Sequence, residues 1–176
     1  MSAHRRLLGG ALAGLLLGAA PVELERDLVP PSRPLLVATA SSTWPGWPAS
    51  KVIDGDPLTS WFSAANESVA RDKAHAPWLE LTFPEPVAVR RVTVRGNHEP
   101  SWPTGYGIAA GTLELFDGAG KLLARQPNET ASKSFDIAFR FKDPVRGVVR
   151  LRFTALADQG DQNPHGDVAV GELEVY

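Results

Sequence analysis

The sequence of 176 residues contains no cysteine. That absence excludes a disulfide framework, thiolate catalysis, a zinc–thiolate centre and a lipid anchor attached through cysteine. An excess of one charge is also missing, because 18 Lys and Arg stand against 20 Asp and Glu, for a formal net charge of −2. A nearly balanced chain without a basic cluster gives no reason to expect nucleic acid or an anionic membrane as a partner.

The common catalytic motifs are absent as well. There is no Gly-x-Ser-x-Gly elbow, no His-Glu-x-x-His, no P-loop and no dinucleotide-binding glycine pattern. His98 and Glu99 form an isolated pair in a predicted loop. Asp54 and Asp56 lie on one tight loop, whereas the two carboxylates of a glycosidase face each other across a cleft. We therefore predict that the protein is not an enzyme.

The longest apolar run is at the N-terminus. Arg5 and Arg6 precede an uncharged Leu/Ala/Gly run that ends at Ala20. The run is too short to cross a bilayer and is typical of an export signal, although Pro21 is unfavourable for cleavage after Ala20. An uncleaved anchor is the alternative. The chain is thus divided into a signal peptide (1–20), a charged, proline-rich linker (21–34) and one domain (35–176), and we expect a secreted, periplasmic or cell-envelope protein.

From residue 35 onward the pattern is that of β-strands. Apolar and polar residues alternate over residues 79–83, 135–142 and 149–153, and β-branched residues are frequent over residues 87–95. A final strand is expected over residues 168–176. About eight short strands separated by Gly, Pro and Asn turns predict an all-β jelly-roll sandwich.

An acidic loop lies at residues 49–61. Asp54 and Asp56 have a glycine between them that lets the backbone bend tightly. Such a loop can direct two carboxylates, backbone carbonyls and the Thr59 hydroxyl toward one point, and oxygen ligands of this kind suit Ca²⁺. The loop does not fit an EF-hand, because Ala65 stands where the bidentate Glu belongs. An Asx-type turn between two strands explains the same residues without a metal.

Several segments together resemble the F5/8 type C, or discoidin, domain, a family that includes the galactose-binding-like modules of carbohydrate-binding family 32. These segments are Val37-Ala38-Thr39-Ala40-Ser41-Ser42 with the Trp-rich loop after it, residues 48–56 with Thr59 and Trp61, residues 77–81, and the closing residues 168–176. They keep the family's order and cover about residues 35–176. The resemblance implies an eight-stranded jelly roll of the galactose-binding-domain-like kind, with its N- and C-terminal strands close together.

The resemblance also implies a structural calcium ion. In calcium-bearing members of the family, an acidic loop of this type and a glutamate near the chain end hold the ion. The implied ligands are the carbonyl oxygens of Lys51 and Gly171 and the side chains of Asp54, Asp56, Thr59 and Glu172. Such an ion would join the first loop of the domain to its last strand, and so close almost the whole domain into one loop.

Family members that bind sugars do so with loops at one end of the sandwich. A sugar site needs an aromatic face for stacking and polar groups that read hydroxyls. The suitable side chains in predicted loops are Trp47, Arg95, Asn97, His98, Trp102, Tyr106 and His165, together with Trp44 and Asp167. Trp44 can equally cap the core, as we expect of Trp61 and Trp78. Sugar-binding relatives often have an acidic residue at the position of Ser50. Its absence here counts against a galactose-type site.

The sequence therefore predicts an exported, non-catalytic module with a structural calcium ion, which binds carbohydrate through loops near Trp102 and Arg95. A protein- or cell-surface-adhesion module that uses the same loops is the alternative. Binding of membrane lipid by aromatic loop tips is a third interpretation. The lack of basic residues beside Trp44 and Trp47 counts against it.

Overall fold

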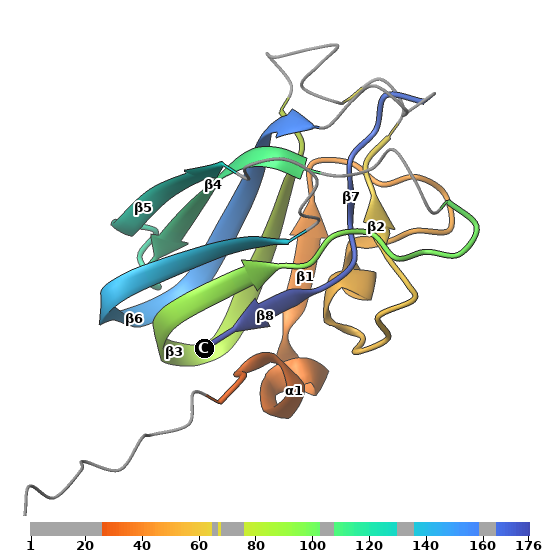
Figure 1. Ribbon diagram of the computed structural model, residues 1–176. Coiled ribbons are helices and arrows are strands. Elements are labelled where there is room, and N and C mark those ends of the chain that lie inside the picture. The colour runs from red at the N-terminus through yellow and green to blue at the C-terminus, as the bar shows by residue number, and fades with distance from the viewer. Residues whose placement is uncertain (1–25, 65–66, 68–75, 103–107, 130–135, 159–164) are drawn as a thin grey trace, which may run out of the picture.

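β-Strands dominate the computed structural model (Figure 1), which describes residues 26–64, 67, 76–102, 108–129, 136–158 and 165–176. The expected signal peptide and Tyr106 lie outside the described residues. The elements are α1 (Val29–Ser32), η1 (Arg33–Leu35), β1 (Val37–Ala40), η2 (Ala49–Ile53), β2 (Trp61–Phe62), β3 (Trp78–Val94), β4 (Ile108–Phe116), β5 (Leu122–Glu129), β6 (Ile137–Asp158), β7 (Ala169–Val170) and β8 (Leu173–Val175).

The strands pair in antiparallel fashion, which confirms the predicted all-β jelly roll. Within the described residues, the larger sheet has six strands in the order β1-β3-β6-β4-β5, with β8 beside β3. The smaller sheet pairs β2 with β7. No helix in the described part of the chain is long and apolar enough to cross a membrane.

β3 and β6 each run through both walls of the sandwich. The first part of β3 pairs with β1 and its last part with β8, while β6 follows it along both parts. Register shifts between Thr82 and Val87 mark the bend of β3, and Figure 1 shows both strands curling round. The sequence pattern predicted two strands, over residues 79–83 and 87–95, where there is one. Bulges bend a strand without ending its pairing, so the pattern of alternation breaks while the strand continues.

The predicted closing strand, in contrast, is divided. β7 pairs with β2, whereas β8 pairs with β3, and the chain crosses from one partner to the other at Gly171 and Glu172. Gly171 passes so close to the segment just after β3 that a Cβ atom there would lie 2.5 Å from the carbonyl oxygen of Gly96. Only glycine permits this close passage, and the crossing places Glu172 beside the first loop of the domain.

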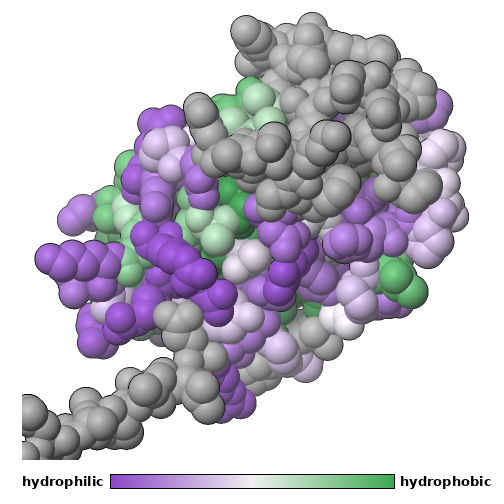
Figure 2. Space-filling model, viewed as in Figure 1, coloured by the Kyte–Doolittle hydropathy of each residue, from purple (hydrophilic) through white to green (hydrophobic). Residues whose placement is uncertain are grey.

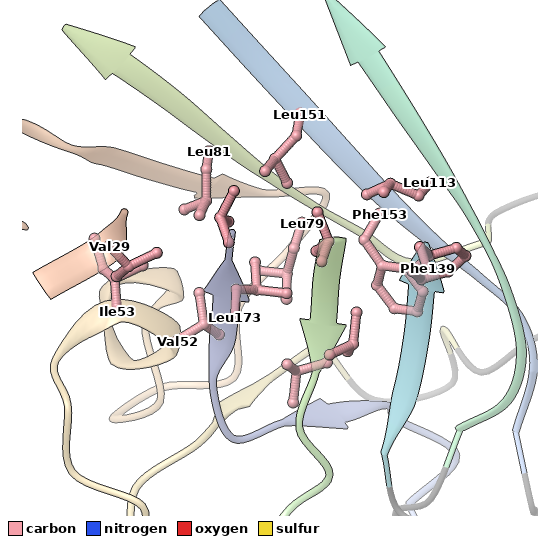
Figure 3. Close-up of a cluster of buried hydrophobic side chains, with 14 of the residues drawn as sticks. Val29, Val52, Ile53, Leu79, Leu81, Leu113, Phe139, Leu151, Phe153 and Leu173 are labelled. Carbon is pink, nitrogen blue, oxygen red and sulfur yellow. The ribbon is translucent and has the colours of Figure 1, made fainter. Parts of the chain in front are cut away.

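The core lies between the two walls. Figure 3 shows the inward side chains of several strands meeting there, among them Leu79, Leu81, Leu151 and Phe153. Each of these is at most 1% exposed. They occupy alternate positions of β3 and β6, so the period-two stripes of the sequence correctly marked the buried face. Burial of these side chains is the main source of the fold's stability.

The two tryptophans expected to cap the core behave differently. Trp61 is 1% exposed and its indole N–H donates a hydrogen bond to the carbonyl oxygen of Ser42, at 2.9 Å. Trp78 is only half-buried, and the guanidinium of Arg152 lies over its ring at 4.4 Å. Trp61 is thus part of the core, whereas Trp78 belongs to the outer face of the sheet, where a cation–π contact covers it.

Part of the predicted linker is packed against the domain. Val29 is 2% exposed, and the backbone N–H of Leu28 donates to the carbonyl oxygen of Val175 at 2.6 Å. The carboxylate of Asp27 accepts hydrogen bonds from the backbone N–H groups of Val29 and Val175, at 3.0 and 3.1 Å. Residues 27–34 therefore differ from a free linker, because one apolar side chain and one carboxylate fasten them to β8.

We expect Asp27→Ala to lower the free energy of unfolding by about 1–3 kcal/mol, because two part-buried backbone donors lose their acceptor. Urea denaturation measures the change. Asp143→Ala, at an exposed position of the β6 bend, is the control and should change stability by less than about 0.5 kcal/mol. Equal effects of the two substitutions would show that Asp27 does not fasten the segment.

Candidate functional site

An open pocket of about 110 Å³ lies beside the short β2–β7 sheet. It is lined by Trp44, Trp47, Phe62, Trp102, His165 and Asp167. Phe62 belongs to β2, and the other residues come from loops before β2, after β3 and before β7. The pocket thus collects side chains from distant parts of the sequence.

The loop that carries Trp44 and Trp47 is fixed to β2 by backbone hydrogen bonds. The N–H of Trp44 donates to the carbonyl oxygen of Phe62 at 2.8 Å, and the N–H of Trp47 donates to that of Trp44 at 3.0 Å. Gly46, with a φ of 93°, lets the chain turn between them. The Trp47 ring meets Phe62 edge-on, with centroids 5.7 Å apart. Both tryptophans are therefore held in place before any ligand arrives.

The loop that carries Trp102 is fixed from beneath by Asn97, which is 4% exposed. The side-chain oxygen of Asn97 accepts hydrogen bonds from the Ser60 hydroxyl at 2.7 Å and the Glu99 N–H at 2.9 Å. Its side-chain N–H donates to the Trp102 carbonyl at 2.6 Å. We predicted Asn97 as a ligand contact; the structure gives it the role of holding the backbone that presents Trp102.

His165 lies between two of the tryptophans. Its ring centroid is 5.7 Å from that of Trp44 and 5.6 Å from that of Trp102, and the Trp102 contact is edge-on. Trp102 itself is 38% exposed, while Asp167 at the pocket is 3% exposed. The arrangement combines an accessible aromatic wall with one buried carboxylate and one imidazole.

Arg95 and His98 are not part of this pocket. They line a separate hollow of about 290 Å³ together with Pro57, Gly96, Gly171, Glu172 and Glu174. The Arg95 guanidinium forms ion pairs with Glu174 and Asp136, at 2.8 and 2.6 Å. The hydrogen bonds to Glu174 and Asp136 raise the pKa of Arg95 further above its usual value. The side chain thus joins the end of β3 to β8 and does not reach the place of Trp102. Figure 2 shows that hydrophilic residues make up much of the described surface in this view.

The acidic loop contains hydrogen bonds of the Asx-turn type, which was the metal-free interpretation of these residues. The Asp54 carboxylate accepts from the N–H of Asp56 at 2.9 Å and from the Thr59 hydroxyl at 2.7 Å. The Asp56 carboxylate accepts from the N–H of Leu58 at 2.9 Å. Gly55 between the two aspartates has a φ of 79°, a conformation that favours glycine.

Glu172 joins this loop to the end of the chain. One oxygen of its carboxylate accepts a hydrogen bond from the N–H of Gly55 at 2.7 Å, across 117 positions of sequence. The predicted neighbours Asp54, Asp56 and Glu172 thus do lie on adjoining segments, and their donor atoms are all oxygen, which fits Ca²⁺ chemically. Among the described residues, however, no three Asp, Glu or His side chains converge as a metal-ligand group.

A family model, the F5/8 type C domain, matches residues 37–165 of the chain. The chain belongs to the F5/8 type C domain family. This confirms the resemblance seen in the sequence. The match covers five of the six described residues that line the aromatic pocket, from Trp44 to His165, and Asp167 lies just beyond it. No curated protein matches the chain.

Solved structures similar to this F5/8 type C domain include three bacterial binding modules. The family 32 module of Clostridium perfringens NanJ, in complex with galactose, has a TM-score of 0.63 at 20% identity and covers 82% of this chain and 95% of its own. A family 32 module of a second C. perfringens protein, in complex with GalNAc-β-1,3-galactose, has a TM-score of 0.67 at 16% identity, covering 86% and 99%. A fucose-binding module of Streptococcus pneumoniae has a TM-score of 0.58 at 14% identity, covering 80% and 89%. At these identities the likeness establishes the fold.

Sequence reasoning found part of the pocket of this domain. It named Trp47, Trp102 and His165, and it left Trp44 open between core cap and ligand contact; all four line the pocket. Phe62 was missed, because a phenylalanine next to a buried tryptophan in a short strand looks like an ordinary core residue. Phe62 is indeed 3% exposed, and only the three-dimensional arrangement shows that it also lines the pocket.

We expect Gly171→Ala to destabilise the domain by about 1–3 kcal/mol, because the added Cβ would meet the Gly96 carbonyl at 2.5 Å. Gly118→Ala is a matched control, since a Cβ there has an ordinary contact of 3.6 Å with Val149. Thermal unfolding of both variants measures the difference. Equal melting temperatures for the two variants would show that the backbone at Gly171 does not pass this close to Gly96.

Proposed function

We propose that this domain is a non-catalytic module that binds the terminal part of a carbohydrate in the aromatic pocket. The observation that carries the proposal is the convergence of Trp44, Trp47 and Trp102 with His165 and Asp167 on one open concavity. Flat aromatic faces stack on the apolar face of a sugar ring, and a carboxylate and an imidazole read its hydroxyl groups. The similar structures support this direction, because two are complexes with galactose and with GalNAc-β-1,3-galactose and a third is a fucose-binding module.

The lining of the pocket favours binding over hydrolysis. Asp167 is the one carboxylate among the described residues that line it. Glycoside hydrolysis ordinarily requires two carboxyl groups on opposite sides of the scissile bond. Asp54 and Asp56 do not supply the second, because they are bound within their own turn and do not line the pocket.

A calcium ion at the acidic loop and export from the cytoplasm are further parts of the proposal. Ca²⁺ would be held by Asp54, Asp56, Thr59 and Glu172 with the carbonyl oxygens of Lys51 and Gly171, and it would supply a structural clip. Its support is the all-oxygen donor set and the bond between Glu172 and Gly55, which already joins the two segments. Export is supported by the apolar N-terminal run that follows Arg5 and Arg6.

A glycan array with the purified domain in calcium-containing buffer tests carbohydrate binding. For any glycan that is retained, we expect Trp102→Ala to weaken binding by about tenfold or more, because it removes the accessible stacking face. Leu122→Ala, which truncates an exposed apolar residue on β5, should leave binding unchanged. Retention of no glycan by the wild type would contradict the proposal; capture of a cell-surface protein by the same loops would then favour adhesion.

Calcium binding predicts a thermal shift. At a calcium concentration of 100 times the dissociation constant, the folded state should gain about 2.7 kcal/mol, and Glu172→Gln should abolish most of this gain. Asp143→Asn, an exposed substitution with the same change of charge, should retain it. Calorimetry with and without a chelator provides the measurement. A melting temperature that does not change with calcium would contradict calcium binding at this site.

A further inference from the structure

Carbon atoms make up most of the surface that lines the aromatic pocket. Four of its six described lining residues are Trp44, Trp47, Phe62 and Trp102. Apart from the indole N–H, an aromatic ring offers carbon to a ligand whether its face or its edge borders the pocket. The pocket therefore favours a ligand group that needs no hydrogen bonds.

The polar part of the lining is small and already has interactions within the chain. Besides the indole N–H groups, the described lining residues with polar side chains are His165 and Asp167, and both have partners elsewhere in the protein. A hydroxyl group that leaves water for such a lining finds few partners, and burial of a polar group without a partner is costly. A methyl group in the same place loses no hydrogen bond and gains from leaving water.

The size of the pocket limits what enters it. Its volume of about 110 Å³ is well below that of sites for drug-sized ligands, which is roughly 300–1,000 Å³. The pocket therefore accommodates one substituent of a sugar ring with the ring atoms next to it, while the rest of a longer glycan remains outside. Between two sugars that differ only in this substituent, the apolar lining decides which one binds more tightly.

We propose that the pocket selects sugars by a methyl group, which enters it in preference to a hydroxymethyl or hydroxyl group. This inference rests on the proposed carbohydrate binding, uses the same pocket, and adds the class of sugar. Two kinds of sugar carry such a methyl group: a 6-deoxyhexose, on its ring, and an N-acetylated amino sugar, at the end of its acetamido group. Both present an apolar carbon at the end of a substituent, whereas an ordinary hexose presents only hydroxyl groups.

NMR titration of the full chain with three matched pairs of free sugars tests the selectivity. The pairs are L-fucose with L-galactose, L-rhamnose with L-mannose, and N-acetylglucosamine with N-formylglucosamine. The first two pairs differ by one hydroxyl group on carbon 6, and the third differs by the methyl group alone. In at least one pair, we expect the methyl-bearing sugar to bind about tenfold or more tightly than its counterpart. A preference in the first or second pair assigns the methyl group to a 6-deoxyhexose, and one in the third pair assigns it to an acetamido group.

Two other outcomes overturn the inference. Comparable affinities within every pair, or a preference for the sugar without the methyl group, overturn it and leave the carbohydrate module standing. Binding of none of the six sugars overturns it too, and the glycan array then decides the proposed function separately.

Polar substitutions in the lining isolate its contribution to the selectivity. Trp102→Gln, at an exposed site, replaces ring carbon with an amide that can bond a hydroxyl group, and it should lower the preference for the methyl-bearing sugar about threefold or more. Trp47→Gln is the second variant; because Trp47 packs against Phe62, thermal unfolding checks that this variant folds. Leu122→Gln makes a similar change at an exposed position of β5 and should leave the preference unchanged. An equal loss of affinity for both sugars of a pair, or no loss, in both folded tryptophan variants contradicts the inference.

Discussion

The pairing of β2 with β7 is the contact on which the candidate site depends. Only two residue pairs form this ladder, yet it joins positions more than 100 residues apart. Phe62, in β2, also accepts the backbone hydrogen bond that fixes the loop of Trp44. His165 and Asp167 lie in the last few residues before β7. The ladder therefore sets a loop from the beginning of the domain against one from its end, and the pocket lies between them.

The same stretch of chain links the pocket to the acidic loop. Immediately after β7, Gly171 crosses to β3 and Glu172 bonds to Gly55. The residues that close the aromatic pocket and the residue that meets the acidic loop are thus separated by a few positions of extended backbone. A calcium ion at the loop would hold this stretch at one end, and the β2–β7 ladder would hold it at the other, which gives the proposed ion a role in keeping the pocket formed.

The sequence predicted features that depend on neighbouring residues better than contacts between residues far apart in the chain. Alternation of apolar residues along β3 and β6 identified their buried faces, because the period of two is a local property. The nearness of Glu172 to the acidic loop was implied by the family resemblance, as part of a calcium site, and not by spacing. The sequence reasoning expected Arg95 near Trp102, whereas the structure places it in a separate hollow, since nothing local shows that Asp136 and Glu174 lie beside it. The role of Asn97 was hidden for the same reason: its partner Ser60 is 37 residues away.

The central claim is that ligands enter the pocket formed by Trp44, Trp47 and Trp102, and the indole N–H signals of the five tryptophans in a ¹H–¹⁵N NMR titration test it most directly. Trp61 and Trp78 are internal references, because one is buried with its N–H bonded to Ser42 and the other stacks with Arg152 on the outer face. With a bound glycan, the account predicts shifts of the three pocket signals while the two references remain in place. Shifts confined to Trp78, or binding without any change at Trp44, Trp47 and Trp102, would contradict it.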